Sequence, residues 1–238
     1  MIKIEQILKV SRQELKYLIN DIEASLLKRN LKDSLIEDLY NKDDQGYMIR
    51  SLYFDSYSNA DFYEKMDGIE DRKKIRLRIY STKDSTAKLE IKRKYGNNQI
   101  KQSVKVSKED ALELIKCNYE VLNKYTSPTA VMIKNIMKTN RLIPVVLIEY
   151  NRTAFMHTLN NIRVTVDTDI RSSETDFRLF SDNVKLVPIE PFKTTVVEVK
   201  YDGYLLGWIN AIISKYHLTR TSFSKYQNSR FIFESYLS

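Results

Sequence analysis

The chain has 238 residues, and 39 Lys and Arg against 31 Asp and Glu give it a formal net charge of +8. One cysteine and two histidines exclude an intrachain disulfide framework and a zinc site of the usual Cys/His kind. The N-terminus lacks the pattern of a secretory signal, and no apolar stretch approaches the ~18 residues that a membrane span requires. We therefore expect a single cytoplasmic domain, residues 1–238, whose positive excess suits an anionic partner.

The first element predicted along the chain is a helix that begins near Ser11. Ser11 and Glu14 have the spacing of a capping box. Apolar residues then recur at helical spacing, namely Leu15, Leu18, Ile19, Ile22 and Leu26. Arg12 and Lys16, four residues apart, would lie together on one flank of this helix.

Segments with two-residue periodicity predict strands at 47–55, 71–80, 87–95, 99–106, 144–155, 161–170 and 194–201. Helices are predicted at 108–119, with Ser107 as N-cap, and at 129–139, 204–216 and 225–236. The Gly96-Asn97-Asn98 sequence predicts a hairpin turn, because Gly and Asn tolerate positive φ. Strands followed and interrupted by helices indicate an α+β fold with an antiparallel sheet or barrel.

Charged residues gather on one face of several predicted strands, since side chains i and i+2 point the same way. Four basic residues, Arg72, Lys74, Arg76 and Arg78, share one face of a strand whose other face carries Ile75, Leu77 and Ile79. Further strands repeat the pattern with Lys88, Glu90, Lys92 and Lys94; with Lys101 and Lys105; with Arg163, Thr165 and Asp167; and with Glu198 and Lys200. Taken alone, each such face would be an ordinary solvated surface.

Neighbouring strands with basic faces repel one another unless an anion lies between them, and two architectures meet that demand. An open sheet would lay its basic face on a polyanion. A closed antiparallel β-barrel would instead hold a charged interior and bury its apolar outer face under helices, and it would leave no unpaired edge. We expect the barrel. The interleaved carboxylates Glu90, Asp167 and Glu198 would suit Mg²⁺ or Mn²⁺ held among phosphate oxygens.

An ordered set of short motifs covers nearly the whole chain. The motifs are Arg12-x-Glu-Leu-Lys16-Tyr17, Ser51–Ser56, Lys74-x-Arg76-x-Arg78-x-Tyr80, Leu89–Lys94, Glu149–Phe155, Arg163–Thr168, Val197–Lys200 and Phe223–Tyr226. Together they resemble the VTC (vacuolar transporter chaperone) domain, the polyphosphate polymerase module of the triphosphate tunnel superfamily. Elsewhere in that superfamily an early strand carries Glu-x-Glu-x-Lys. Here Arg12-x-Glu14-x-Lys16 stands in its place, which favours the polymerase branch.

The resemblance implies a CYTH-like triphosphate tunnel, a closed antiparallel barrel with helices outside. It implies transfer of the γ-phosphate of ATP onto inorganic polyphosphate with release of ADP, supported by Mn²⁺ or Mg²⁺. The family's phosphate-sensing SPX segment and its membrane helices are not expected in this chain. Any translocation of the polymer would therefore need a membrane-protein partner.

The resemblance also assigns roles by position. Residues similar to the family's catalytic phosphate-binding groups are Arg76, Arg78, Lys92, Arg152, Arg163 and Lys225. Further substrate-binding residues are expected at Arg12, Lys16, Lys74, Lys94, Lys105 and Lys200, and metal ligands at Glu198 and Glu90, with Glu149 as a further helper. Arginine forks suit phosphate, and phosphoryl transfer needs no Ser, Cys or His nucleophile.

Two other functions remain open from the sequence, and a third is weaker. The same tunnel would act as a tri- or polyphosphatase if water accepted the phosphate. A non-catalytic polyphosphate-binding regulatory module would bind the polymer without releasing ADP. Nucleic-acid binding is not expected, because the basic residues alternate along strands instead of gathering on a recognition helix.

Overall fold

The computed structural model describes residues 12–42, 45–96, 98–189 and 194–234. Its contacts divide the chain into two compact units. Unit 1 comprises Met1–Tyr47, Asn151–Thr168 and Phe192–Phe223, and unit 2 comprises Met48–Tyr150, Asp169–Pro191 and Ser224–Ser238. Two long strands, β7 (Ile143–His157) and β8 (Ile162–Ser173), contribute residues to both units.

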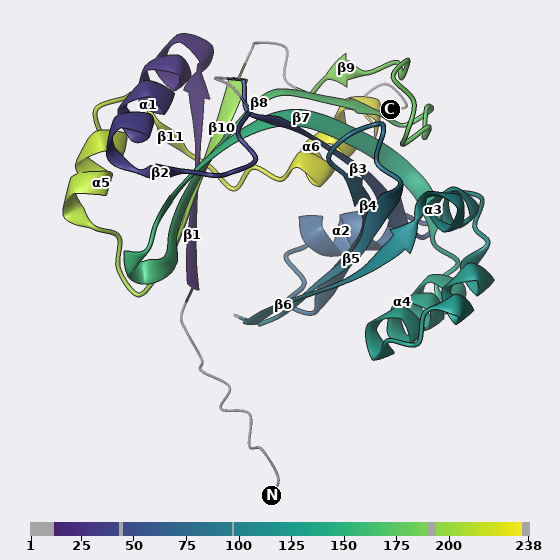
Figure 1. Cartoon of the computed structure of the whole chain (residues 1–238). Coiled ribbons are helices and arrows are strands. Elements are labelled where there is room, and N and C mark those ends of the chain that lie inside the picture. The colour runs from purple at the N-terminus through teal and green to yellow at the C-terminus, as the bar shows by residue number, and fades with distance from the viewer. Residues whose placement is uncertain (1–11, 43–44, 97, 190–193, 235–238) are drawn as a thin grey trace, which may run out of the picture. The chain divides into compact units, whose positions relative to one another are not determined.

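Unit 1 is built on an antiparallel arrangement of strands in the order β11-β1-β10-β8. Its elements are β1 (Arg12–Asn20), α1 (Asp21–Ser34), β2 (Ile36–Glu37), the 3₁₀ turn η2 (Leu159–Asn161), β10 (Thr194–Asp202), α5 (Gly207–Ile213) and β11 (Thr219–Arg220). The short strand β2 pairs with the last part of β7. The helices α1 and α5 lie beside each other in Figure 1.

The core of unit 1 lies between one face of these strands and the two helices. Fully buried aliphatic residues of β8 and β10, such as Val164 and Val199, pack with Leu27 and Leu31 of α1 and with Ile209 of α5. Burying each such side chain stabilises the unit by roughly 1.5–3 kcal/mol. The opposite face of the same strands is left for charged residues.

The helix predicted from residue 11 is wrong in its first half, because residues 12–20 form the strand β1. Leu15, Tyr17 and Ile19 also alternate with period two, and pairing with β10 and β11 turns this face toward the core. Helix α1 begins only after Asn20, whose side chain accepts a hydrogen bond from the Glu23 amide at 2.9 Å.

The rest of the expected helical stripe is also displaced by this change. Ile22 is 78% exposed and Leu26 is 47% exposed, so neither faces the core. The buried residues of α1 are Ala24, Leu27 and Leu31 instead. Ser11, the expected cap, lies outside the described residues.

Unit 2 contains the antiparallel strand order β3-β4-β5-β6. The strands are β3 (Tyr47–Asp55), β4 (Arg72–Ile79), β5 (Thr86–Tyr95), β6 (Asn98–Ser107) and the short β9 (Val187–Pro188). The helices are α2 (Ala60–Met66), α3 (Lys108–Ile115), the 3₁₀ helix η1 (Tyr119–Lys124), α4 (Pro128–Thr139) and α6 (Lys225–Glu234).

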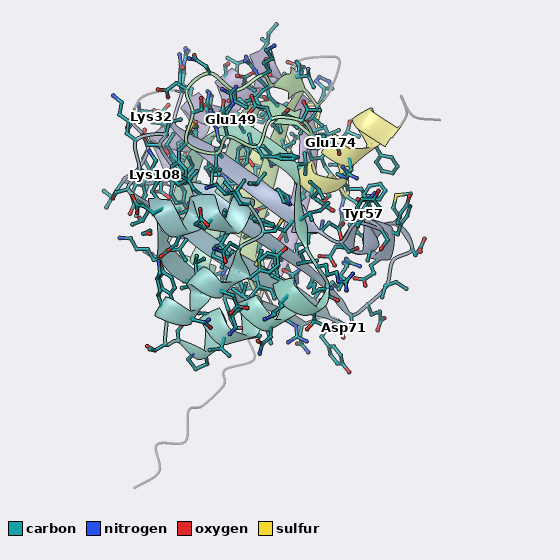
Figure 2. All side chains as sticks on the ribbon, turned by 90° about the vertical axis from the view of Figure 1, so that its right-hand side faces the viewer. Lys32, Tyr57, Asp71, Lys108, Glu149 and Glu174 are labelled. Carbon is teal, nitrogen blue, oxygen red and sulfur yellow. The ribbon has the colours of Figure 1, made fainter. Side chains whose placement is uncertain are left out.

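The core of unit 2 lies between the apolar face of β4 and β5 and the helices α3, η1 and α4. Ile75 and Leu77 of β4 are fully buried, and they belong to one cluster with Leu114 of α3 and Ile133 of α4. Figure 1 shows α3 and α4 together beside the ends of β5 and β6, and Figure 2 views this side, with Lys108 labelled at the start of α3. The apolar faces of the predicted strands are therefore covered by outer helices, as expected.

The predicted strands are confirmed with small shifts at their ends, and Ser107 caps α3 by accepting from the Asp110 amide. The helix predicted over 108–119 ends early, because Cys117 has a φ of 65° and closes the C-terminus of α3. Helix α5 is shorter than predicted, and residues 235–236 of the last predicted helix lie outside the described residues.

The expected closed barrel is not found. The strand order of the described residues runs β11-β1-β10-β8-β7-β3-β4-β5-β6, and no hydrogen-bonded pairing joins its two end strands. The sheet is therefore open, while its antiparallel character and outer helices agree with the α+β expectation. Among the described residues, no helix combines the length and the apolar character needed to cross a membrane.

Candidate active site

The strand register of unit 2 places charged side chains in rows across β4, β5 and β6. One row runs Tyr53, Arg76, Glu90 and Ser103; a second runs Ser51, Arg78, Lys88 and Lys105; a third runs Lys74, Lys92 and Lys101; and a fourth runs Arg72, Lys94 and Gln99. We call the part of this surface on β4, β5 and β6 the basic face. Glu90 is its only carboxylate, and every residue of these three strands is described.

Glu90 is the centre of the basic face and is 2% exposed. Its Oε2 accepts from Arg76 Nε at 2.7 Å and lies 3.6 Å from Arg78 Nε, while Oε1 lies 2.6 Å from Lys101 Nζ. Burial raises the pKa of Glu90, but Arg76, Arg78 and Lys101 together outweigh it and lower the pKa to about 2. One buried carboxylate therefore holds three cations in place.

The two arginines of β4 have further partners on β3. Arg76 Nη1 donates to the hydroxyl oxygen of Tyr53 at 2.7 Å, and Arg78 Nε donates to Ser51 Oγ at 3.3 Å. Arg78 is 8% exposed. Both guanidinium groups are thus held by neighbours, and a planar guanidinium suits two oxygens of a phosphate group.

The first turn of α6 brings Lys225 to this region of unit 2 and places Tyr226 beside Lys74 of β4. Lys225 Nζ lies 4.6 Å from the ring centroid of Tyr150, and Lys74 Nζ lies 4.6 Å from that of Tyr226. Lys74 also lies within 3.4 Å of Ser224 Oγ. These contacts hold the two ammonium groups against aromatic rings.

The lysines of β5 and β6 extend the positive charge toward the edge of the sheet. Lys88 and Lys105 pair directly across the two strands, as do Lys92 and Lys101. Like charges that face each other in this way destabilise a sheet by a fraction of a kcal/mol to ~1 kcal/mol per pair. An anion bound across the rows would remove this repulsion.

The charged face of unit 1 is built differently. In the register, Glu14 of β1 pairs with Lys200 of β10, and Lys16 pairs with Glu198. Lys16 Nζ lies 2.9 Å from Glu14 Oε1 and 3.7 Å from Glu198 Oε2, and Lys200 contacts both carboxylates as well. We call this set, with Arg163 of β8 opposite Lys200, the balanced face, because acids and bases alternate on it.

Glu198 is ionised on the balanced face. Its side chain is 13% exposed, and burial raises its pKa. The charges of Lys200 and Lys16 outweigh burial, and the pKa of Glu198 falls well below its usual range. Lys16 also donates to the carbonyl oxygen of Phe223 at 3.4 Å.

The two arginines of unit 1 are held by carboxylates. Arg152 Nε and Nη2 donate to the two oxygens of Asp167 at 2.6 and 2.7 Å, and Asp167 is fully buried. Arg163 Nη2 donates to Asp38 Oδ2 at 2.7 Å and to the Tyr47 hydroxyl at 3.3 Å. The bidentate edge of Arg152 is therefore occupied by protein, whereas Arg163 keeps donors in reach of solvent.

The model of one protein family matches almost all of this chain: the VTC domain, over residues 11–233. The chain belongs to the VTC domain family. No curated protein matches it. Among solved structures, HpAC1 from Hippeastrum, an adenylyl cyclase candidate with a dominant triphosphatase activity, is 9% identical, with a TM-score of 0.53 over 91% of this chain and 94% of that one. An adenylate cyclase candidate from Bacillus halodurans is 11% identical, with a TM-score of 0.47 over 86% and 88% of the two chains.

The sequence-predicted residues of the VTC domain fall into two groups. Unit 2 brings together Lys74, Arg76, Arg78, Glu90, Lys92, Lys94, Lys105 and Lys225. Unit 1 holds Lys16, Arg152, Arg163, Glu198 and Lys200, and Arg12 lies exposed at the first residue of β1. Glu149, named as a metal helper, instead forms an ion pair with the buried Arg50, at 2.6 Å, and is not part of the basic face.

Sequence reasoning missed three residues of the basic region in unit 2: Tyr53, Lys101 and Tyr226. Lys101 shares the alternation of its strand, so the signal for it was present. The two tyrosines lie within the quoted motifs but received no assigned role, because nothing in a single sequence separates a packing tyrosine from one that contacts an arginine.

The carboxylates differ in how well they fit a divalent cation. Glu90 is engaged by three cations and has no second carboxylate beside it on the basic face, so it does not fit a metal ligand. The oxygens of Glu14 and Glu198 also contact cations, Lys16 and Lys200, but these two carboxylates lie together. Glu14 and Glu198 share one face of β1 and β10, and two carboxylates completed by phosphate oxygens and water are the donor set that Mg²⁺ or Mn²⁺ takes. The described residues contain no group of three or more His, Cys, Asp or Glu that would hold a metal by protein ligands alone.

Proposed function

We propose that this VTC domain is a polyphosphate polymerase, which transfers the γ-phosphate of ATP onto inorganic polyphosphate and releases ADP. The observation that carries the proposal is the basic face, where rows of Lys and Arg cross three strands around one carboxylate. Membership of the VTC domain family supports it. A polymer of phosphates supplies the repeated negative charge that such rows need.

The basic face would act on the transferred phosphate by position and charge. Phosphoryl transfer places its demand on positive charge around the equatorial and leaving oxygens, with little covalent help from protein. Arg76 and Arg78 offer planar donors to those oxygens, and Lys92 and Lys225 offer point charges. Lys74, Lys94 and Lys105 would hold the neighbouring phosphates of the polymer.

The polymer itself would supply the nucleophile. An oxygen of its terminal phosphate forms a bond to the γ-phosphorus of ATP, and the bond from that phosphorus to the β–γ bridging oxygen breaks. The electron pair leaves with ADP. No serine, cysteine or histidine of the chain takes part, so the basic groups have only to align the two phosphate chains.

Unit 1 carries candidate metal-binding and phosphate-binding groups of its own. Glu198 with Glu14 would hold Mn²⁺ or Mg²⁺, which supplies positive charge to phosphate oxygens when bound. Lys16 and Lys200 neutralise these carboxylates in the metal-free protein, and they would contact phosphate oxygens only once a metal ion is held by Glu14 and Glu198. Arg163 would donate to phosphate, whereas Arg152 would orient its neighbours through Asp167.

The product formed from ATP and Mn²⁺ tests the proposal. Purified protein should release ADP and build a phosphate polymer that is visible on a gel, and the Arg76→Ala, Arg78→Ala double variant should not. Binding of polyphosphate with steep salt dependence but without release of ADP would identify a regulatory binding module instead.

A second candidate is hydrolysis of triphosphate or polyphosphate. The fold shared with HpAC1, a protein with dominant triphosphatase activity, favours it over other phosphate chemistry. In that case water replaces the polymer as nucleophile on the same basic face. Free phosphate as the sole product in the assay above would establish this activity and exclude the polymerase.

A further inference from the structure

Tyr53 occupies an unusual place for a packing tyrosine, at the end of the row that contains Arg76 and Glu90. The side chain is buried, with 8% of the residue exposed, yet its hydroxyl group faces charge. The hydroxyl oxygen accepts from Arg76 Nη1 at 2.7 Å. Among the described residues, no acceptor is found for the hydroxyl proton.

The ring of Tyr53 packs against a second tyrosine. It lies 5.2 Å from the ring of Tyr226, at an interplanar angle of 37°, and the guanidinium of Arg76 lies 5.5 Å from its centroid. Tyr226 is in turn fixed by donating its hydroxyl proton to Asp55, a fully buried carboxylate at the end of β3. Tyr53 is therefore a rigid group whose hydroxyl position is set by packing.

Asp55 also connects two elements of unit 2. It accepts from the backbone amides of Asp61 and Phe62, at 2.9 and 3.0 Å, and so joins β3 to the first turn of α2. The hydroxyl groups of Tyr53 and Tyr226 differ in one respect: the first meets a cation and the second meets a carboxylate. Only the first retains a proton to give.

We propose that Tyr53 is a phosphate-contacting residue, which donates its hydroxyl proton to a phosphate oxygen held by Arg76. The inference rests on the proposed function, because it takes the basic face as the phosphate site. Arg76 and Tyr53 then act as one unit: the guanidinium donates to the phenol oxygen and to phosphate, and the phenol donates to the same phosphate. Such linked donors strengthen each other.

The electrostatics of Tyr53 agree with this role. Burial raises the pKa of the phenol. The positive charges of Arg76 and Arg78 lower it by more, with Lys225 adding to them, so that the pKa lies below its ordinary value. A more acidic phenol is a stronger hydrogen-bond donor to an anion.

Binding of inorganic triphosphate, measured by calorimetry without metal, tests the proposal on the full chain. The Tyr53→Phe variant keeps the ring and its packing and should bind about tenfold more weakly, the factor expected for one hydrogen bond to a charged group. Tyr125→Phe is the control, since it removes one hydroxyl group that donates to a carboxylate, Asp110, elsewhere in unit 2. It should lower the melting temperature but change the affinity less than about twofold.

The affinities distinguish failure of the role of Tyr53 from failure of the proposed function. Equal affinity of Tyr53→Phe and the unaltered chain would overturn the role of Tyr53 and leave the proposed function standing. Equal losses for both tyrosine variants would also overturn it, because the effect would then come from lost stability. An unaltered chain that does not bind triphosphate would overturn both the role and the proposed function.

The pH dependence gives a second readout. The groups that face Tyr53 are Arg76 and Arg78 on β4, Glu90 on β5, and Lys225 and Tyr226 on α6. Their own titration affects both proteins alike, so it cancels in the ratio of the two affinities. As the pH rises from about 7 to about 10, the phenol loses its proton, and the tenfold ratio should fall to about one or below. A constant ratio would contradict donation by the phenol.

If Tyr53→Phe does not fold, the unaltered sequence labelled with 3-fluorotyrosine replaces it. Fluorination makes the phenol more acidic without changing the chain. The alkaline loss of triphosphate affinity should then move to lower pH. An unchanged pH profile would overturn the assignment.

Discussion

The two units carry the same design with opposite electrostatic outcomes. Each has antiparallel strands with one apolar face under helices and one charged face. On the balanced face of unit 1, Glu14 and Glu198 alternate with Lys16 and Lys200, so the folded protein neutralises its own charges. On the basic face of unit 2, one carboxylate stands among rows of Lys and Arg.

This difference separates cations that are paired with carboxylates within the protein from cations that remain available to bind a ligand. An arginine such as Arg152, whose fork is filled by Asp167, has little left to offer phosphate. Arg76 and Arg78 share a single carboxylate with Lys101, and the excess positive charge persists. We therefore expect substitutions in unit 2 to act mainly on phosphate binding and those in unit 1 mainly on metal dependence.

The largest expected effect is that of Arg76→Ala combined with Arg78→Ala. Each guanidinium makes charge-assisted hydrogen bonds worth roughly 1.5–3 kcal/mol to a phosphate, so ADP release should fall by about 100-fold to 10,000-fold. The control is Arg171→Ala, which removes an arginine from the ion pair of an exposed residue, Asp169, and should leave the rate unchanged. Similar rates for the double variant and the control would remove the basic face from the mechanism.

Glu90→Gln should destabilise the free protein, because it removes the carboxylate that pairs with three cations. The pKa of Glu90 is lowered from 4.5 to about 2, which corresponds to about 3 kcal/mol of stability at neutral pH. Because the folded pKa is the lower one, this contribution is present above pH 4.5 and is lost as the pH falls toward about 2. Urea unfolding at neutral and acidic pH measures it.

The glutamine variant also tests the role of an external anion. With the counter-ion removed, Arg76, Arg78 and Lys101 repel one another in the free protein. Added triphosphate should therefore raise the melting temperature of Glu90→Gln by more than that of the unaltered chain. An equal or smaller rise would mean that anions do not bind among these three cations.

Glu198→Gln should have a smaller effect on activity, through metal dependence. It removes one of two carboxylates of the balanced face, so stabilisation by Mn²⁺ and Mn²⁺-dependent ADP release should each fall, the rate by about tenfold. Triphosphate affinity without metal should stay within about twofold. Glu120→Gln, which changes an exposed residue paired with Lys138, is the control. A loss of metal-free triphosphate affinity would show that the two units do not divide the work in this way.

The sequence predicted which strand faces are charged and which are apolar more reliably than it predicted whether each segment is a helix or a strand. Alternation decided the faces of β4, β5 and β6, because each position is either packed under a helix or exposed to charge. It failed at β1, where Leu15 and Ile19 suit a helix and a strand equally. Pairing with β10 decides between the two, and no local signal in residues 12–20 reports it.

A local signal did exist for the true start of α1. Asn20 and Glu23 have the spacing of a capping box and bond to each other in both directions. The site residues show the same division. Strand face and motif predicted the positions of the arginines. The role of Tyr53 instead depends on two other residues: Tyr226, which is distant in sequence, and Asp55, which is close to it. The three side chains meet only in the folded unit.

The smallest expected effect compares one lysine from each face. Lys105, on the edge strand β6, forms no ion pair with any carboxylate of the described residues, whereas Lys200 is held by Glu198 and Glu14. A cation that meets phosphate releases counter-ions, so Lys105→Ala should reduce the dependence of polyphosphate affinity on salt by about one in the double-logarithmic slope. Lys200→Ala should leave the metal-free slope unchanged, because its charge is already neutralised in the protein. Identical slopes for the two variants would mean that phosphate does not distinguish the paired lysine from the unpaired one, and the contrast between the two faces would then lie in stability alone.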